Sequence, residues 1–164
     1  MKDLSILDSL ITGRVEPHIY AFTTNTIPNY LKVGDTYRPV SKRLREWREY
    51  FPNLEQKFEG SAKITDDVYF RDFAVHYFLE SEKRRVRLKA SDLSEGGYYS
   101  KEFFREATVD DVEEAITDIH EDYNSKSGKY HYYDSKVNAI EDYLREIIIQ
   151  YLTEHKKRPK EERF

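Results

Sequence analysis

The chain has 164 residues, a net charge of −4 and no cysteine, which excludes disulfides, zinc–thiolate sites and cysteine nucleophiles. Apolar residues make up only 38% but aromatic residues 15%, so tyrosine and phenylalanine must supply much of the core of a folded chain. The length suits one domain with a small appendage. No apolar run approaches the roughly 20 residues that span a bilayer, and the N-terminus has no signal-peptide pattern, so we expect a cytoplasmic protein without a membrane partner.

The first half of the chain predicts a helix, a hairpin and a second helix. Residues 3–12 carry leucine and isoleucine at helical spacing. Residues 18–24 and 30–35 have the pattern of two strands joined by a short loop. A helix follows from Pro39, because proline suits a first turn, and Pro52 stops it. Its apolar stripe consists of Val40, Leu44, Trp47 and Phe51.

The next stretch predicts a third strand and a further helix. Residues 56–64 alternate between apolar and polar side chains, as a strand does. A helix is expected over about 67–82, with Thr65 or Asp66 as its cap. Residues 98–105 are expected to form a short strand or a turn.

Two amphipathic helices are predicted to close the chain, over about 109–123 and 137–151, with a turn at 125–128 between them. Residues 1–105 hold 18 Lys/Arg and 16 Asp/Glu, a balance of +2, whereas residues 106–164 hold 9 and 15, a balance of −6. The predicted fold class is therefore α/β: a small three-stranded, mixed or antiparallel sheet flanked by helices in 1–105, and an acidic helical extension in 106–164.

The hairpin brings together groups that suit phosphodiester chemistry. Because strand side chains alternate, Tyr20 and Lys32 are predicted to share one face of adjacent strands. An ammonium beside a phenol stabilises the phenolate, which would make Tyr20 a better proton acceptor for a water. Gly34 leaves space for a close backbone approach. The alternative is an ordinary Tyr–Lys cross-strand pair on a solvated face.

Basic side chains follow the hairpin in two groups. Arg43 lies at the margin of the apolar stripe, where a guanidinium could bind a phosphate through two hydrogen bonds. Its neighbours would position phosphates on DNA or simply form a solvated basic face. The basic run 83–89 could be an edge that contacts phosphates or simply a charged strand edge that resists aggregation. The predicted DNA-binding residues are Lys42, Arg45, Arg48, Arg85 and Arg87.

The predicted helix 67–82 supplies the best metal candidate. Asp72 occupies a position in the apolar stripe, and a carboxylate there needs a partner or a cation. His76 lies one turn later and could hydrogen-bond Asp72 or a substrate phosphate. Glu102 is a second acid, and one or two carboxylates suffice for Mg²⁺. The alternatives are a salt bridge of Asp72 to Arg71, Lys32 or Arg43, and a surface position for Glu102.

Taken together, these pieces resemble the GIY-YIG nuclease family over about residues 17–105. Ile19-Tyr20 is similar to the end of the first motif, with His18 in place of its glycine, and Lys32-Val33-Gly34 is similar to the second motif of the phage-type branch. Thr36 and Arg43 follow at that branch's spacing. Asp72-xxx-His76 resembles its Glu-xxx-His helix, and Glu102-Phe103-Phe104 resembles its Glu-aromatic-Phe ending.

The resemblance implies a three-stranded α/β domain that cuts DNA with Mg²⁺ or Mn²⁺. Tyr20 would be the general base or would orient the water, Lys32 would replace the second tyrosine, and Arg43 would hold the scissile phosphate. Asp72, with Glu102, would ligate the metal, and His76 would assist. Asp72 is one methylene shorter than the family's glutamate, and the family's late asparagine has no counterpart.

Several alternatives stay open at this point. One is a catalytically inactive nucleic-acid-binding module of a larger restriction or helicase protein. Another is a protein-interaction domain that uses the acidic C-terminal helices, which an exposed apolar patch there would favour. The charged end after Arg158 leads to the hypothesis of a fused or associated helicase or restriction subunit, in a bacterial or phage-type cytoplasm.

Overall fold

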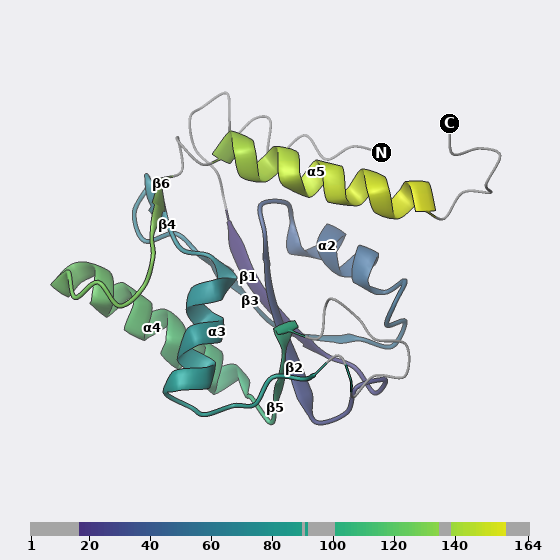
Figure 1. Ribbon diagram of the computed structural model, residues 1–164, viewed down its shortest axis with the longest axis horizontal. Helices are drawn as coiled ribbons and strands as arrows, with labels where there is room; N and C mark the ends of the chain where they lie inside the picture. Colours follow the sequence, from purple (N-terminus) through teal and green to yellow (C-terminus); the bar gives the residue numbers. More distant parts are fainter. Residues whose placement is uncertain (1–16, 90, 92–100, 135–138, 157–164) are drawn as a thin grey trace.

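A computed structural model describes residues 17–89, 91, 101–134 and 139–156 (Figure 1). The predicted helix over 3–12 and the charged end from residue 157 lie outside these residues, as does most of the segment between 91 and 101. Within the described part, no helix combines the length and the apolar character needed to cross a membrane.

The centre of the fold is the predicted hairpin, β1 (His18–Thr23) and β2 (Tyr30–Thr36), paired in antiparallel register. The third predicted strand is also confirmed, as β3 (Glu55–Ser61) on the far side of β1. The prediction of three strands in the sheet is wrong, because β5 (Phe103–Arg105) adds a fourth beside β2, in the order β3-β1-β2-β5. β5 is the short strand, one of the two alternatives expected within 98–105. All pairs are antiparallel, so the sheet is not mixed.

Helices cover both faces of this sheet (Figure 1). On one face, Tyr20 and Phe22 pack against α2 (Val40–Trp47), whose apolar stripe lies where the spacing predicts it. On the other face, Ile19 and Ala21 pack against α3 (Asp72–Ser81) and α4 (Val109–Ser125). Because both faces are buried, the hairpin carries apolar residues at successive positions instead of a clean alternation.

The segment before α3 is extended, so the prediction of a helix over 67–82 is wrong at its start. The Thr65 hydroxyl accepts hydrogen bonds from the backbone N–H groups of Asp67 and Val68, which closes a turn rather than capping a helix. β4 (Val68–Tyr69) then pairs with β6 (Tyr133–Asp134) in a small second sheet. A two-residue strand leaves no periodic signal, and its partner lies more than 60 residues away.

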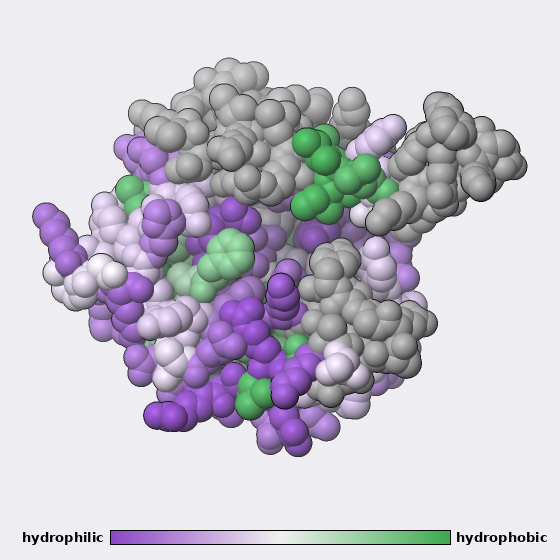
Figure 2. Space-filling view, in the orientation of Figure 1, coloured by the Kyte–Doolittle hydropathy of each residue, from purple (hydrophilic) through white to green (hydrophobic). Residues whose placement is uncertain are grey.

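The two closing helices are confirmed as α4 and α5 (Ala139–Lys156), but more than a turn separates them, because β6 lies between. The start of α4 follows local chemistry: Thr108 and Asp111 form a capping box. α5 lies across α2 in Figure 1. A hydrophobic patch over α5 is visible in Figure 2, and exposed apolar side chains on this helix include Ile148, Ile149, Tyr151 and Leu152.

Candidate active site

Tyr20 and Lys32 meet on one face of the hairpin, as predicted, but that face is buried. Tyr20 is 1% exposed and Lys32 is 0% exposed, so the alternative of a solvated cross-strand pair is wrong. The Lys32 ammonium donates a hydrogen bond of 3.2 Å to the Tyr20 hydroxyl. Gly34 lies directly opposite Tyr20 in the register. A Cβ atom at Gly34 would stand 2.6 Å from both polar atoms, so the pair requires glycine there.

The indole of Trp47 completes this arrangement from α2. Its Nε1–H donates a 2.8 Å hydrogen bond to the Tyr20 hydroxyl, which therefore accepts two hydrogen bonds. The Lys32 ammonium lies 4.2 Å from the centre of the indole ring, within cation–π range. On the outer side of the same indole, the Arg43 guanidinium lies 5.0 Å from the ring centre and pairs with Glu46 at 2.8 Å.

Glu102 neutralises the buried ammonium of Lys32. The two side chains form a short ion pair, in which the Glu102 side chain is 31% exposed and therefore reaches solvent. Burial alone would lower the pKa of Lys32, but the Glu102 carboxylate and the Tyr20 oxygen hold it above its usual value. Glu102 thus connects the hairpin pair to the protein surface, in place of the isolated surface acid that was the alternative.

Asp72 and His76 lie on α3, one turn apart, with His76 Nε2 4.0 Å from a carboxylate oxygen of Asp72. Burial lowers the pKa of His76 to about 4, so the imidazole is neutral and its Nε2–H donates to the Val33 carbonyl at 2.8 Å. Arg71, one of the predicted alternative partners of Asp72, pairs with Asp35 at 2.7 Å, and its charge also acts on Asp72.

Asp35 also fixes the start of α3. Its carboxylate accepts a 2.8 Å hydrogen bond from the Asp72 backbone N–H, one of the donors that a helix leaves unpaired at its first turn. Burial alone would raise the pKa of Asp35, but the Arg71 guanidinium lowers it. Burial and the charges of Asp35 and Glu102 raise the pKa of Asp72 well above its usual value.

The two groups come from opposite faces of the sheet and approach each other at its edge. Tyr20 and Lys32 lie on the α2 face, whereas Asp72 and His76 belong to α3 on the other face. The register of β2 with β5 ends at the pair Lys32–Phe103, and Glu102 stands just before it. The charges of Glu102 and Lys32 act on both Asp72 and His76. All six predicted catalytic and metal residues therefore belong to one electrostatically connected region.

This region offers two carboxylates, Asp72 and Glu102, as oxygen ligands for a hard cation, which is fewer ligands than a complete protein site supplies. Arg71 and Lys32 favour the ionised form of the buried Asp72 carboxyl, but burial and the charges of Asp35 and Glu102 outweigh them, so a bound cation would favour that form further. Among the residues that the structure describes, no group of three or more His, Cys, Asp or Glu side chains is arranged so that it could hold a metal ion. Mg²⁺ commonly uses one or two carboxylates and retains waters, so Asp72 and Glu102 fit such an ion.

The predicted DNA-binding residues fall into two sets. Lys42 and Arg45 line a shallow hollow between α2 and α5, and Arg48 is exposed at the end of α2. Arg85 pairs with Asp111 at 2.9 Å, and Arg87 Nη1 donates to the Lys101 carbonyl at 3.0 Å. The backbone around these two arginines runs along β5 through hydrogen bonds of residues 86 and 88. The basic run therefore lies along the edge strand β5, a position that both of its predicted interpretations share.

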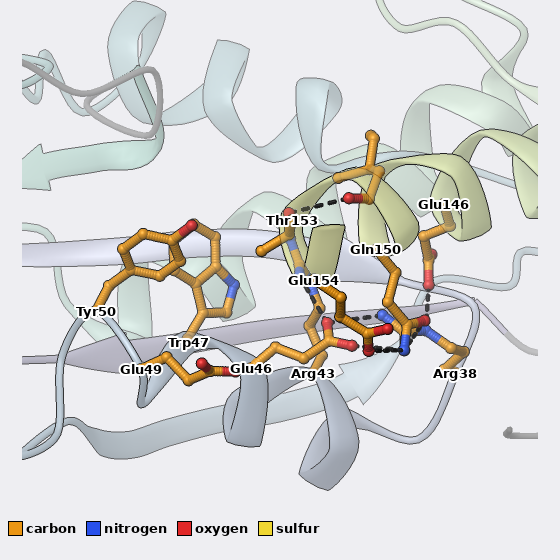
Figure 3. A pocket seen from close by; sticks show the side chains of 11 residues that line it. Arg38, Arg43, Glu46, Trp47, Glu49, Tyr50, Glu146, Gln150, Thr153 and Glu154 are labelled. Atoms are coloured by element: carbon orange, nitrogen blue, oxygen red, sulfur yellow. Dashed lines mark hydrogen bonds and ion pairs between the residues drawn. The ribbon is translucent and has the colours of Figure 1, made fainter. Parts of the chain in front are cut away.

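A cavity of about 80 Å³ lies between α2 and α5 (Figure 3). Arg43 lines it, but neither Tyr20 nor Asp72 does. Arg38 is buried at its base and makes two 2.8 Å hydrogen bonds to Glu46. Burial alone would lower the pKa of Arg38, but Glu46 and Glu146 raise it. In this structure, α5 therefore covers the basic side of α2.

Sequence reasoning missed residues whose roles depend on long-range contacts. Trp47 is predictable only as part of an apolar stripe, although its N–H is the closest donor to Tyr20. Asp35 directly follows the Lys-Val-Gly motif, which is the one local signal that it belongs to the site. Arg38 pairs with Glu46 on α2 and with Glu146 on α5, and no local sequence signal indicates the pair with Glu146.

Comparisons with protein-family models, with curated proteins and with solved structures find no match for this chain.

Proposed function

We propose that this chain is a metal-dependent DNA endonuclease domain that hydrolyses phosphodiester bonds with Mg²⁺ or Mn²⁺, as members of the GIY-YIG family do. One observation carries the proposal. The six residues that the sequence predicts as catalytic or metal-binding are spread between positions 20 and 102. Hydrogen bonds, ion pairs and charge interactions connect them in one region at the edge of the sheet. This arrangement places a tyrosine, a lysine, a histidine and two carboxylates within reach of one another's charges, as the proposed chemistry requires.

The side chains of this region suit distinct parts of a hydrolysis. Tyr20 would accept a proton from the attacking water or orient it, and Lys32 and Trp47 hold its hydroxyl in place. Arg43 would bind the scissile phosphate after exchanging its partner Glu46 for the substrate. Asp72 and Glu102 would hold the metal, which would supply charge stabilisation at the leaving oxygen.

A nucleic-acid-binding module that does not cleave is the second candidate, and a specific observation favours it. The Tyr20 hydroxyl is buried and already accepts two hydrogen bonds, so a substrate cannot reach it in this arrangement. The endonuclease proposal therefore requires the α2 side of the sheet to open when DNA binds.

Incubation of supercoiled plasmid with the purified protein and Mg²⁺ or Mn²⁺ separates the two candidates. We expect nicking by the unmodified protein and a loss of about 100-fold or more in Tyr20→Phe and Asp72→Asn. Matched controls are Tyr77→Phe, which removes a hydroxyl from a half-exposed tyrosine, and Asp66→Asn, which neutralises an exposed loop acid. Both controls should nick like the unmodified protein.

DNA binding without nicking at any metal concentration would refute the endonuclease proposal and favour the binding module. Equal nicking by all variants would show that a contaminating nuclease causes the activity.

A further inference from the structure

The carboxylate of Glu146 on α5 is bound by donors from three consecutive residues, the last residue of β2 and the two that follow it. The Thr36 hydroxyl donates to it at 3.2 Å, the Tyr37 backbone N–H at 3.2 Å and the Arg38 Nε–H at 2.5 Å. Thr36 and Arg38 are 1% and 4% exposed, so these donors have little access to water. A hydroxyl, a backbone N–H and a guanidinium that converge on one point form a site for an oxyanion.

The geometry of these donors is set by the chain between β2 and α2 and does not depend on Glu146. The Thr36 hydroxyl accepts a 3.1 Å hydrogen bond from the Arg38 backbone N–H, which closes a local turn. The Arg38 guanidinium is held by two hydrogen bonds to Glu46. The donors would therefore keep their positions if another anion replaced the carboxylate.

This oxyanion site is connected to the candidate active site through one side chain. Glu46 binds Arg38 with both of its oxygens, and one of them also accepts a hydrogen bond from Arg43. Arg43 is the residue that would hold the scissile phosphate. A nucleic-acid backbone carries a phosphate on each successive nucleotide, so a strand bound at Arg43 would bring another phosphate toward Arg38.

In this structure, the carboxylates of α5 occupy the path of such a strand. Figure 3 shows Glu146, Gln150 and Glu154 of α5 pointing toward Arg38 and Arg43 across the cavity. Glu46 and Glu49 line the same cavity from α2. While α5 stays in place, a phosphodiester would meet the carboxylates of Glu146 and Glu154 in addition to those of Glu46 and Glu49.

We propose that Thr36, the Tyr37 N–H and Arg38 form a site that binds a phosphate of the DNA backbone. In this structure the carboxylate of Glu146 occupies that site, so α5 and DNA compete for it. The inference rests on the proposed function, because it takes DNA as the ligand. It adds a contact beyond the six predicted residues and gives α5 a role: it closes the nucleic-acid surface until DNA displaces Glu146.

Binding of a fluorescent 20-base-pair duplex in EDTA, measured by anisotropy in the full chain, tests this competition without requiring cleavage. In Glu146→Gln the competing side chain loses its charge, so we expect affinity to rise about tenfold, the effect of one charged hydrogen-bonding group. The slope of log K against log salt should steepen by about 0.9, because one more phosphate is contacted.

Glu154→Gln is the matched control, because it removes the same charge from the same helix and cavity. The one hydrogen bond that the structure gives its carboxylate comes from Gln150 on α5, at 3.4 Å. The affinity of Glu154→Gln should change by less than about threefold, because the Glu154 carboxylate occupies none of the three donors and its charge is partly screened by salt. In Glu146→Gln, the added Thr36→Val change should return affinity and salt slope toward those of the unmodified protein. Thr36→Val avoids removing the buried Arg38, whose loss would take away two of the hydrogen bonds that Glu46 accepts.

An equal gain in Glu146→Gln and Glu154→Gln, or an unchanged salt slope, would overturn the inference, since the effect would then be general charge repulsion. If Glu146→Gln binds DNA more tightly but no variant cleaves with metal, the endonuclease proposal fails and the phosphate site stands. If the unmodified protein cleaves DNA but Glu146→Gln binds no better than the control, the phosphate site fails alone.

Discussion

A single methyl group added at Gly34 should disrupt the candidate active site. The ideal Cβ of Gly34→Ala would lie 2.6 Å from Lys32 Nζ, 2.6 Å from the Tyr20 hydroxyl oxygen and 2.8 Å from Tyr20 Cζ. None of these atoms can move freely, because Tyr20 and Lys32 are buried under α2 and bonded to each other and to Trp47 or Glu102. The phenol must therefore shift away from the strand.

The cost of Gly34→Ala follows from two contributions. Overpacking of a well-filled interior costs about 1–3 kcal/mol. Displacement of the phenol also weakens its hydrogen bonds with Trp47 and Lys32, at about 1 kcal/mol each. We expect the free energy of unfolding to fall by about 3 kcal/mol, with DNA nicking lost in the fraction that remains folded.

Urea unfolding followed by tryptophan fluorescence measures this change at the site itself, because Trp47 is the only tryptophan. The matched control is Gly60→Ala on β3. There the added Cβ would lie 2.8 Å from Phe58 Cζ, at the far end of a partly exposed ring on an edge strand, which can turn aside. We expect it to cost less than about 1 kcal/mol. A Gly34→Ala protein within about 0.5 kcal/mol of the unmodified protein would refute this description of the hairpin.

Three further predictions concern stability in urea. Glu102→Gln should lower the free energy of unfolding by about 3 kcal/mol, because it leaves the ammonium of Lys32 buried without its partner. Lys32→Met should cost less, since the Glu102 carboxylate that it leaves behind reaches solvent. Equal losses of stability in the two variants would contradict this asymmetry. Thr108→Ala should cost about 1 kcal/mol by removing the capping box of α4, and an unchanged midpoint would show that the cap contributes nothing. Burial alone would raise the pKa of Asp122, but the Tyr132 hydroxyl and two backbone N–H groups hold it below its usual value. The stability that the Asp122 carboxylate contributes is therefore present above about pH 4, and it is lost as the pH falls through the lowered pKa of the folded state. Asp122→Asn should therefore cost about 1–3 kcal/mol at pH 7 and progressively less below about pH 4, and a pH-independent difference would contradict the assignment.

The elements that the sequence predicted correctly are those with a strong local period. The hairpin strands β1 and β2 and the helices α2 and α4 bury apolar residues at the spacing that the sequence displays. The errors fall on very short strands. β4 and β5 have two and three residues, and their hydrogen-bonding partners are distant in the chain. Such strands exist because a partner is present, and neighbouring residues do not reveal it.

The candidate site divides in the same way. Sequence alternation placed Tyr20 and Lys32 on one face, and helical spacing placed His76 one turn after Asp72; both relations hold. The alternative prediction, in which Tyr20 and Lys32 form a pair on a solvated face, is wrong, because α2 packs over that face of the hairpin and buries both side chains. The roles of Trp47 and Glu146 depend on contacts across 27 and 110 residues of chain, which no local pattern encodes.

The sequence by itself determined the period of each long element, the side of the strand on which each hairpin residue lies, and the kinds of chemical group available. These follow from backbone geometry, which acts over a few residues. Only the tertiary structure decided which of these groups are buried, which charges pair, and that a carboxylate of α5 lies among the donors of Thr36–Arg38. Those outcomes depend on desolvation and on distances between segments far apart in the chain, and packing fixes both.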